Sequence, residues 1–236
     1  MEFLTSVYNS VSSLAFCTED EGDLPSEAVL LIVAGLRRKL NTSYSDESHE
    51  LLLREVYQAG NLGERSGSEF ERVSTAYKHL GFQREDPISD LRGGGILSLE
   101  NIHYILKQQN GLAMDVIARR SNREAGSNYP WAAGGVNVTR MVAALFEVIS
   151  ASGAPMGAHS KKKYWHLLEE GAFERLYVCA FVLLDKTFEQ EQADYMRFPA
   201  VLALTKERFE QMLGSAQTVA DVEAELGVAP APAPAL

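Results

Sequence analysis

The sequence predicts an all-α protein, and the spacing of its apolar residues is the main reason. Through three long stretches of the 236 residues, apolar side chains recur three and four positions apart, which places them on one face of a helix. No stretch alternates apolar and polar residues as a half-buried strand does. With 46% apolar and 23% charged residues, the composition is that of a folded globular chain and excludes collagen-like, disulfide-scaffold and wholly disordered classes.

The predicted helices begin before Pro25, where residues 3–14 show helical spacing with Ser, Thr and Asn on the polar face. We expect this N-terminal extension to dock on the protein's own body, and the acidic residues 18–23 to form a linker. Asn137 is expected to cap one of the later helices, and Gly153 with Pro155 to end it. The further helices are expected over 70–80, 99–106, 138–150, 173–188 and 201–213.

Thr218 and Gly227 bound a last, short capped helix. The alternating Ala-Pro sequence after it, 229–236, lacks an amide donor at every proline, so we expect an extended and disordered tail. We therefore divide the chain into an N-terminal extension with its linker (1–24), one helical domain (25–214), and a short helix with an Ala/Pro-rich tail (215–236).

Charge and apolar runs limit the partners of this chain. Lys and Arg number 22 against 32 Asp and Glu, a net charge of −10, which argues against nucleic acid as the main partner. The longest apolar run, 28–36, is about half the length that spans a bilayer, and no basic residue precedes Arg37 as a signal peptide would require. Cys17 and Cys179 are expected to be reduced thiols, with a single disulfide as the lesser alternative. We expect a cytoplasmic protein.

Residues 81–95 break the helical pattern with proline and glycine and concentrate polar groups. Gly93 to Gly95 follow Arg92 directly, and without side chains they let a ligand or another backbone approach. Asp90 lies two residues before Arg92 and is placed to hold its guanidinium in one orientation.

Several familiar chemistries do not fit this loop. No Lys follows the glycines as a P-loop requires, and Ser98 stands where the third glycine of a dinucleotide-binding pattern belongs. The histidines and cysteines lack metal-ligand spacing, so no metal site is expected. An enzyme that uses two of the carboxylates of Glu85, Asp86 and Asp90 for acid–base chemistry stays open as an alternative.

A longer pattern includes this loop and reads Tyr77-x3-Gly81-Phe82-Gln83-x3-Pro87-x-Ser89-Asp90-Leu91-Arg92-Gly93-x-Gly95-x3-Leu99. It resembles the signature of the ELMO domain, as found in the ELMO-domain-containing (ELMOD) proteins of the ELMO/CED-12 family. Tyr77 and Ser89 stand where that family has Trp and Thr. The blocks 128–132 and 136–139 and the stretch 173–213 are similar to later parts of the domain, so the resemblance covers about Ser26 to Gly214.

The resemblance implies a single multi-helix ELMO domain with GTPase-activating activity toward small GTPases of the Arf and Arl families. In the ELMOD branch, an arginine of the Asp-Phe/Leu-Arg-Gly element is credited with this activity, and it corresponds to Arg92. The protein would then be an enzyme activator and not itself an enzyme. It would have no cofactor or metal of its own, because GTP and Mg²⁺ belong to the partner GTPase. The other loop residues expected to shape the loop or contact the GTPase are Gly81, Gln83, Pro87, Asp90, Gly93 and Gly95.

Two other interpretations stay open. Arg92 could form a structural ion pair with Asp90 or with an acid of another helix. The protein could also be a non-catalytic adaptor that binds a small GTPase or a cytoskeletal or membrane-traffic complex. The run Lys161 to Lys163 favours a solvated loop over contact with a GTPase or an anionic membrane, so we expect at most peripheral contact with an organelle membrane or the cilium.

Overall fold

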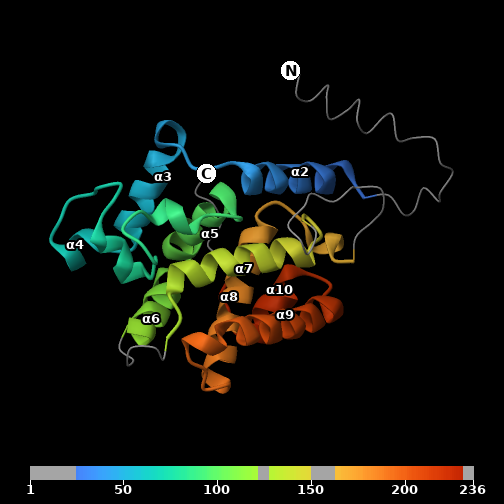
Figure 1. Ribbon diagram of the computed structural model, residues 1–236. Helices are drawn as coiled ribbons and strands as arrows, with labels where there is room; N and C mark the ends of the chain where they lie inside the picture. Colours follow the sequence, from blue (N-terminus) through green and yellow to red (C-terminus); the bar gives the residue numbers. More distant parts are fainter. Residues whose placement is uncertain (1–24, 122–127, 150–162, 231–236) are drawn as a thin grey trace.

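The computed structural model describes residues 25–121, 128–149 and 163–230, and every regular element within these ranges is helical (Figure 1). The prediction of an all-α fold is confirmed. The α-helices are α2 (Glu27–Asn41), α3 (Asp46–Ala59), α4 (Leu62–Ser66), α5 (Gly95–Gln108), α6 (Asn110–Ser121), α7 (Trp131–Leu145), α8 (Ala172–Gln190), α9 (Phe198–Ser215) and α10 (Val219–Leu226). Short 3₁₀ turns are η2 (Thr75–Leu80), η3 (Pro87–Asp90), η4 (Trp165–Leu167) and η5 (Tyr195–Arg197).

Several predictions fall on residues outside these ranges. They are the N-terminal extension and acidic linker (1–24), Cys17, Lys161 and Lys162, the helix stop at Gly153 and Pro155, and the tail from residue 231 onward. Among the described helices, none is both long enough and apolar enough to cross a membrane.

Helix α7 runs across the middle of the molecule (Figure 1). On one side it packs against α5, which in turn contacts α2 and α3. On the other side it packs against α8, which contacts α9 and α10. One continuous apolar core therefore extends through all of these layers.

The predicted stripe of α8 forms the densest part of this core. Its apolar residues from Phe173 to Phe188 are buried, as the helical spacing predicts. Cys179 is among them as a free thiol, and burial raises its pKa to about 12. The thiol is therefore neutral and acts as a small apolar side chain.

The predicted short helix near the C-terminus is confirmed as α10. The Thr218 side chain accepts a hydrogen bond from the Asp221 amide, the Asp221 carboxylate accepts one from the Thr218 amide at 2.7 Å, and Gly227 ends the helix at φ 66°. The helix is tied to α8 by a 2.6 Å ion pair between Arg175 and the buried Glu223. This helix therefore belongs to the same core as the helices before it.

The start of α7 differs from the prediction. Asn137 is not a cap but lies inside the helix, where its side-chain amide donates to the Ala133 carbonyl at 2.8 Å. The helix begins after Pro130 and ends at Leu145, and Glu147 has a left-handed φ of 51°. The pair Gly134 and Gly135 concealed its first half, because glycine usually signals a helix end.

Close packing explains these two glycines. A side chain at Gly134 would come within 2.9 Å of the Tyr129 ring, and one at Gly135 within 2.6 Å of the Tyr177 hydroxyl. Both neighbours are buried aromatic residues that lie directly against the α7 backbone. The glycines therefore allow close contact within the core and do not break the helix.

The predicted helix over 70–80 is shorter than expected. Only η2 is helical, with Tyr77 and Leu80 buried, while Val73 is 42% exposed and lies before the turn. Ser74 interrupts the pattern because it adopts an extended conformation, caps η2 with its hydroxyl, and donates its amide to the Glu85 carbonyl at 2.9 Å.

A buried carboxylate joins α6, α8 and the segment before α7. Asp185 accepts hydrogen bonds from Arg120 Nη2 at 2.6 Å, Arg119 Nη2 at 2.7 Å and the Tyr129 hydroxyl at 3.0 Å. Asp185 and Arg120 are each 4% exposed. Burial first, and then the Asp185 charge, raise the pKa of Tyr129 well above its ordinary value, so its hydroxyl stays a donor.

We expect Asp185→Ala to lower the free energy of unfolding by about 3–5 kcal/mol, because it removes the acceptor of the buried Tyr129 hydroxyl and leaves buried Arg120 with only its ion pair to Glu189. The partly exposed i,i+4 pair of Glu50 with Arg54 offers the matched control, and Glu50→Ala should cost about 0.5 kcal/mol or less. Urea unfolding of both variants measures the difference. Equal losses would mean that the buried carboxylate does not hold these helices together.

Candidate functional site

Arg92 lies on the loop between η3 and α5, and its side chain is exposed. It makes no hydrogen bond or ion pair with any residue of the described ranges. The alternative of a structural ion pair for Arg92 therefore has no support in the part of the chain that the structure describes. The guanidinium faces solvent and is available to an external anion.

The loop is fixed at its C-terminal end by Gly95, whose φ is 54°. A side chain there would lie 2.3 Å from the Leu40 carbonyl oxygen and 2.5 Å from that of Lys39, so the loop backbone packs directly on the end of α2. The next residue, Ile96, donates its amide to the Thr42 carbonyl at 2.9 Å. The chain thus leaves the loop in one defined direction.

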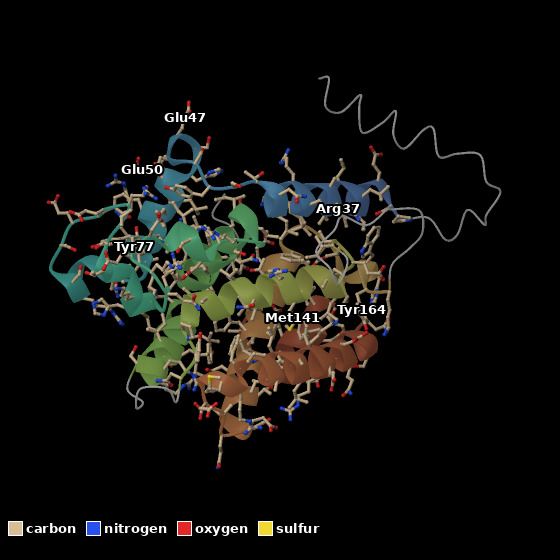
Figure 2. The ribbon with its side chains drawn as sticks, in the orientation of Figure 1. Arg37, Glu47, Glu50, Tyr77, Met141 and Tyr164 are labelled. Carbon is tan, nitrogen blue, oxygen red and sulfur yellow. The ribbon has the colours of Figure 1, made fainter. Side chains whose placement is uncertain are left out.

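Gly81 fixes the N-terminal end in the same way. Its φ is 79°, and a side chain would come within 2.3 Å of the Trp131 nitrogen at the start of α7. The Ala133 amide donates to the Gly81 carbonyl at 3.3 Å. Tyr77, labelled in Figure 2 beside α3 and α4, packs edge-on against Phe82 at a ring distance of 5.8 Å and supports the loop from the core.

Asp90 closes the loop internally, by a contact other than the one predicted. Its carboxylate accepts the Gln83 amide at 2.6 Å and does not contact Arg92. Burial raises the pKa of Asp90, while the Gln83 amide and the nearby Arg84 oppose that increase. The backbone amide was the nearer donor because the turn at η3 brings residues 83 and 90 together. Asp90 therefore shapes the loop, and Arg92 keeps no partner among the residues that the structure describes.

The remaining acids of the loop are also engaged. Asp86 caps η3 through the Ile88 amide at 3.1 Å and pairs with Arg72 at 3.2 Å, and Pro87 is buried at the first position of that turn. Glu85 pairs with Lys78 at 3.3 Å. These contacts give Asp86 and Asp90 structural roles, which disfavours the acid–base alternative. In the described ranges, no three His, Cys, Asp or Glu side chains gather as metal ligands would.

A residue that the sequence did not indicate lies against the same loop. Gly93 has a φ of 81°, and a side chain there would come within 3.3 Å of Cζ of Arg140, which is exposed on α7. The Arg140 guanidinium thus lies against the residue that follows Arg92. Arg140 follows the block 136–139, but its spacing resembles that of any exposed helical arginine.

The family comparison covers both the helical body and the loop that carries Arg92. The model of the ELMO/CED-12 family matches residues 34–202, more than two thirds of the chain, so the protein belongs to this family. The predicted membership is confirmed, and the match lies inside the predicted domain (25–214), whose exact boundaries stay a prediction.

Named relatives agree with this assignment. ELMO domain-containing protein C of Dictyostelium discoideum is 30% identical over 152 residues, which cover 61% of this chain and 24% of that protein. ELMO domain-containing protein B of the same organism is 31% identical over 160 residues, which cover 66% of this chain and 50% of that protein. Human ELMO domain-containing protein 2 is 27% identical over 150 residues, which cover 60% of this chain and 45% of that protein. The chain therefore matches about a quarter to a half of the length of these curated relatives.

We expect Gly81→Ala to destabilise the protein by about 3 kcal/mol or more, because a left-handed φ and a backbone clash with Trp131 act together. Gly67 is the matched control: its φ is 67°, but a side chain there would meet nothing within 4 Å, so Gly67→Ala should cost about 1 kcal/mol. Urea unfolding compares the two. A loss at Gly81 no larger than at Gly67 would show that the loop is not seated on α7.

The hydrogen bond between Asp90 and Gln83 predicts a graded response to substitution. Asp90→Asn keeps a carbonyl oxygen for the Gln83 amide and removes a partly buried charge, so thermal stability should stay within about 2 °C of wild type. Asp90→Ala leaves the amide without its acceptor and should speed its hydrogen exchange about tenfold. Equal exchange rates in the two variants would contradict this role of Asp90.

Proposed function

We propose that this protein is a GTPase-activating protein for small GTPases of the Arf and Arl families, and that Arg92 enters the partner's nucleotide site in trans. One observation carries the proposal: Arg92 is exposed, and no described residue binds it, on a loop whose two ends are fixed to the core. The resemblance of this loop to that of the ELMOD proteins supports the same role. The activity, partner and substrate that we assign to the whole protein are part of this proposal.

The chemistry needs little from the activator. A small GTPase supplies its own phosphate-binding loop and Mg²⁺, and negative charge builds up on the transferred γ-phosphate in the transition state. A guanidinium is always protonated and binds two oxygens at once, so it stabilises that charge well. Such an arginine accelerates hydrolysis by about 10³–10⁵-fold, or about 4–7 kcal/mol of the barrier.

The loop suits this role because its shape is set before the partner arrives. Gly81 and Gly95 pack on α7 and α2, and Asp90 joins the two arms through the Gln83 amide. Little backbone entropy is therefore lost when Arg92 enters a nucleotide site. In this proposal the protein has no nucleotide, metal or cofactor of its own and meets its GTPase in the cytoplasm or at an organelle membrane.

We expect wild-type protein to accelerate single-turnover GTP hydrolysis by at least one member of a panel of GTP-loaded Arf and Arl proteins. Arg92→Lys should lose about 100-fold or more of the acceleration at saturation, because an ammonium group cannot bind two oxygens in the same plane. Its affinity for the GTPase should change by less than about threefold.

Lys206→Ala is the control, because Lys206 is exposed on α9, away from the loop, and should leave the acceleration unchanged. A proportional loss of binding and turnover in Arg92→Lys would contradict the catalytic role. Binding by wild type without acceleration of any panel member would favour a non-catalytic adaptor.

A further inference from the structure

The positive charges of this acidic protein are distributed unevenly between internal contacts and solvent. Most described Lys and Arg side chains make an ion pair or hydrogen bond, as in the pairs Lys39–Glu100 and Arg175–Glu223. Within the described ranges, those that make neither are Arg84, Arg92, Arg140 and Lys206. All but Lys206 belong to the loop 81–95 or lie against it. Three of the four cations without such a contact in the described ranges therefore lie on this loop or against it.

Arg140 differs from Arg84 and Arg92 because it belongs to a helix of the core and not to the loop itself. It projects from α7 between Thr139 and Met141, which are 0% and 6% exposed, so its backbone is held by the core. Figure 2 labels Met141, the next residue, on α7 in the middle of the molecule. The Arg140 guanidinium lies beside the Gly93 backbone, where the absence of a side chain makes room for it.

This position is beside the residue that follows Arg92 in the loop. Because Arg140 lies against Gly93, the residue after Arg92, a GTPase that takes Arg92 into its nucleotide site also approaches Arg140. A cation with no internal partner is suited to binding a carboxylate there.

We infer that Arg140 is a second contact with the GTPase, binding an acidic side chain at the rim of its nucleotide site. The inference rests on the proposed function and extends it from catalysis to partner recognition. Arg140 sets affinity, and Arg92 sets turnover. Because the chain as a whole is acidic, these local cations also favour the approach of an acidic partner surface to this face.

The test uses full-length protein and the GTPase that wild type accelerates most, loaded with a non-hydrolysable GTP analogue. Binding is titrated at several salt concentrations for wild type, Arg140→Ala, Arg140→Lys and Lys206→Ala. We expect Arg140→Ala to weaken binding about tenfold and to flatten its salt dependence. Arg140→Lys should restore most of the affinity, because a single charge is sufficient, and turnover at saturation should stay within about twofold in every variant.

Each contrary result has a distinct meaning. If Arg140→Ala binds like Lys206→Ala, the inference is wrong while the proposed function stands. A loss of turnover at saturation would assign Arg140 to the phosphate and overturn the docking role. A melting temperature lowered by more than about 5 °C, without rescue by Arg140→Lys, would show that Arg140 only supports the loop. If wild type neither binds nor accelerates any panel member, both proposals fail, and binding without acceleration leaves the docking role to be judged on affinity alone.

Discussion

The position of the loop 81–95 depends on the hydrogen bonds that the buried Asp185 carboxylate accepts. This carboxylate binds Arg120 of α6 and the hydroxyl of Tyr129, and so fixes the segment that leads into α7. The first residue of α7, Trp131, is the one on which Gly81 rests. Because a carboxylate buried to this extent is stable only with its donors in place, the carboxylate, the start of α7 and the loop form one continuous support.

The two fixed ends of the loop allow Arg92 to remain exposed. Gly81 and Gly95 bring the loop backbone into direct contact with the start of α7 and the end of α2, and Asp90 is occupied by the Gln83 amide. An Asp90 carboxylate paired with Arg92 would have offset the positive charge of the guanidinium and competed with a phosphate for it. The loop thus combines a rigid backbone with an unpaired charge, which is the combination that stabilisation of a transition state requires.

Long amphipathic helices could be predicted from the sequence, because their apolar spacing is set by the core that they face. The stripe of α8 and the capping residues Thr218 and Gly227 are examples. The start of α7 could not, since the fit of Gly134 and Gly135 against Tyr129 and Tyr177 is a tertiary contact with no local signal. Helices α2, α3, α4 and α6 were not predicted, although Ser45 and Asp46 stand at the N-cap and first position of α3.

Some features of the candidate site could likewise be predicted from the sequence, and others could not. The pattern around Arg92 is contiguous in sequence, and it suggested both the family and the residue. The contact of Asp90 with Gln83 and the position of Arg140 beside Gly93 depend on how distant segments fold together, so spacing alone pointed to a different partner for Asp90 and did not indicate Arg140.

The most direct test of the account is the affinity of this protein for a GDP-loaded GTPase with and without aluminium fluoride, which mimics the transferred phosphoryl group. If Arg92 stabilises the transition state, aluminium fluoride should tighten binding of wild type by about 100-fold or more, and Arg92→Lys should show almost none of this gain. An equal gain in wild type and Arg92→Lys would contradict the claim that Arg92 acts on the phosphate.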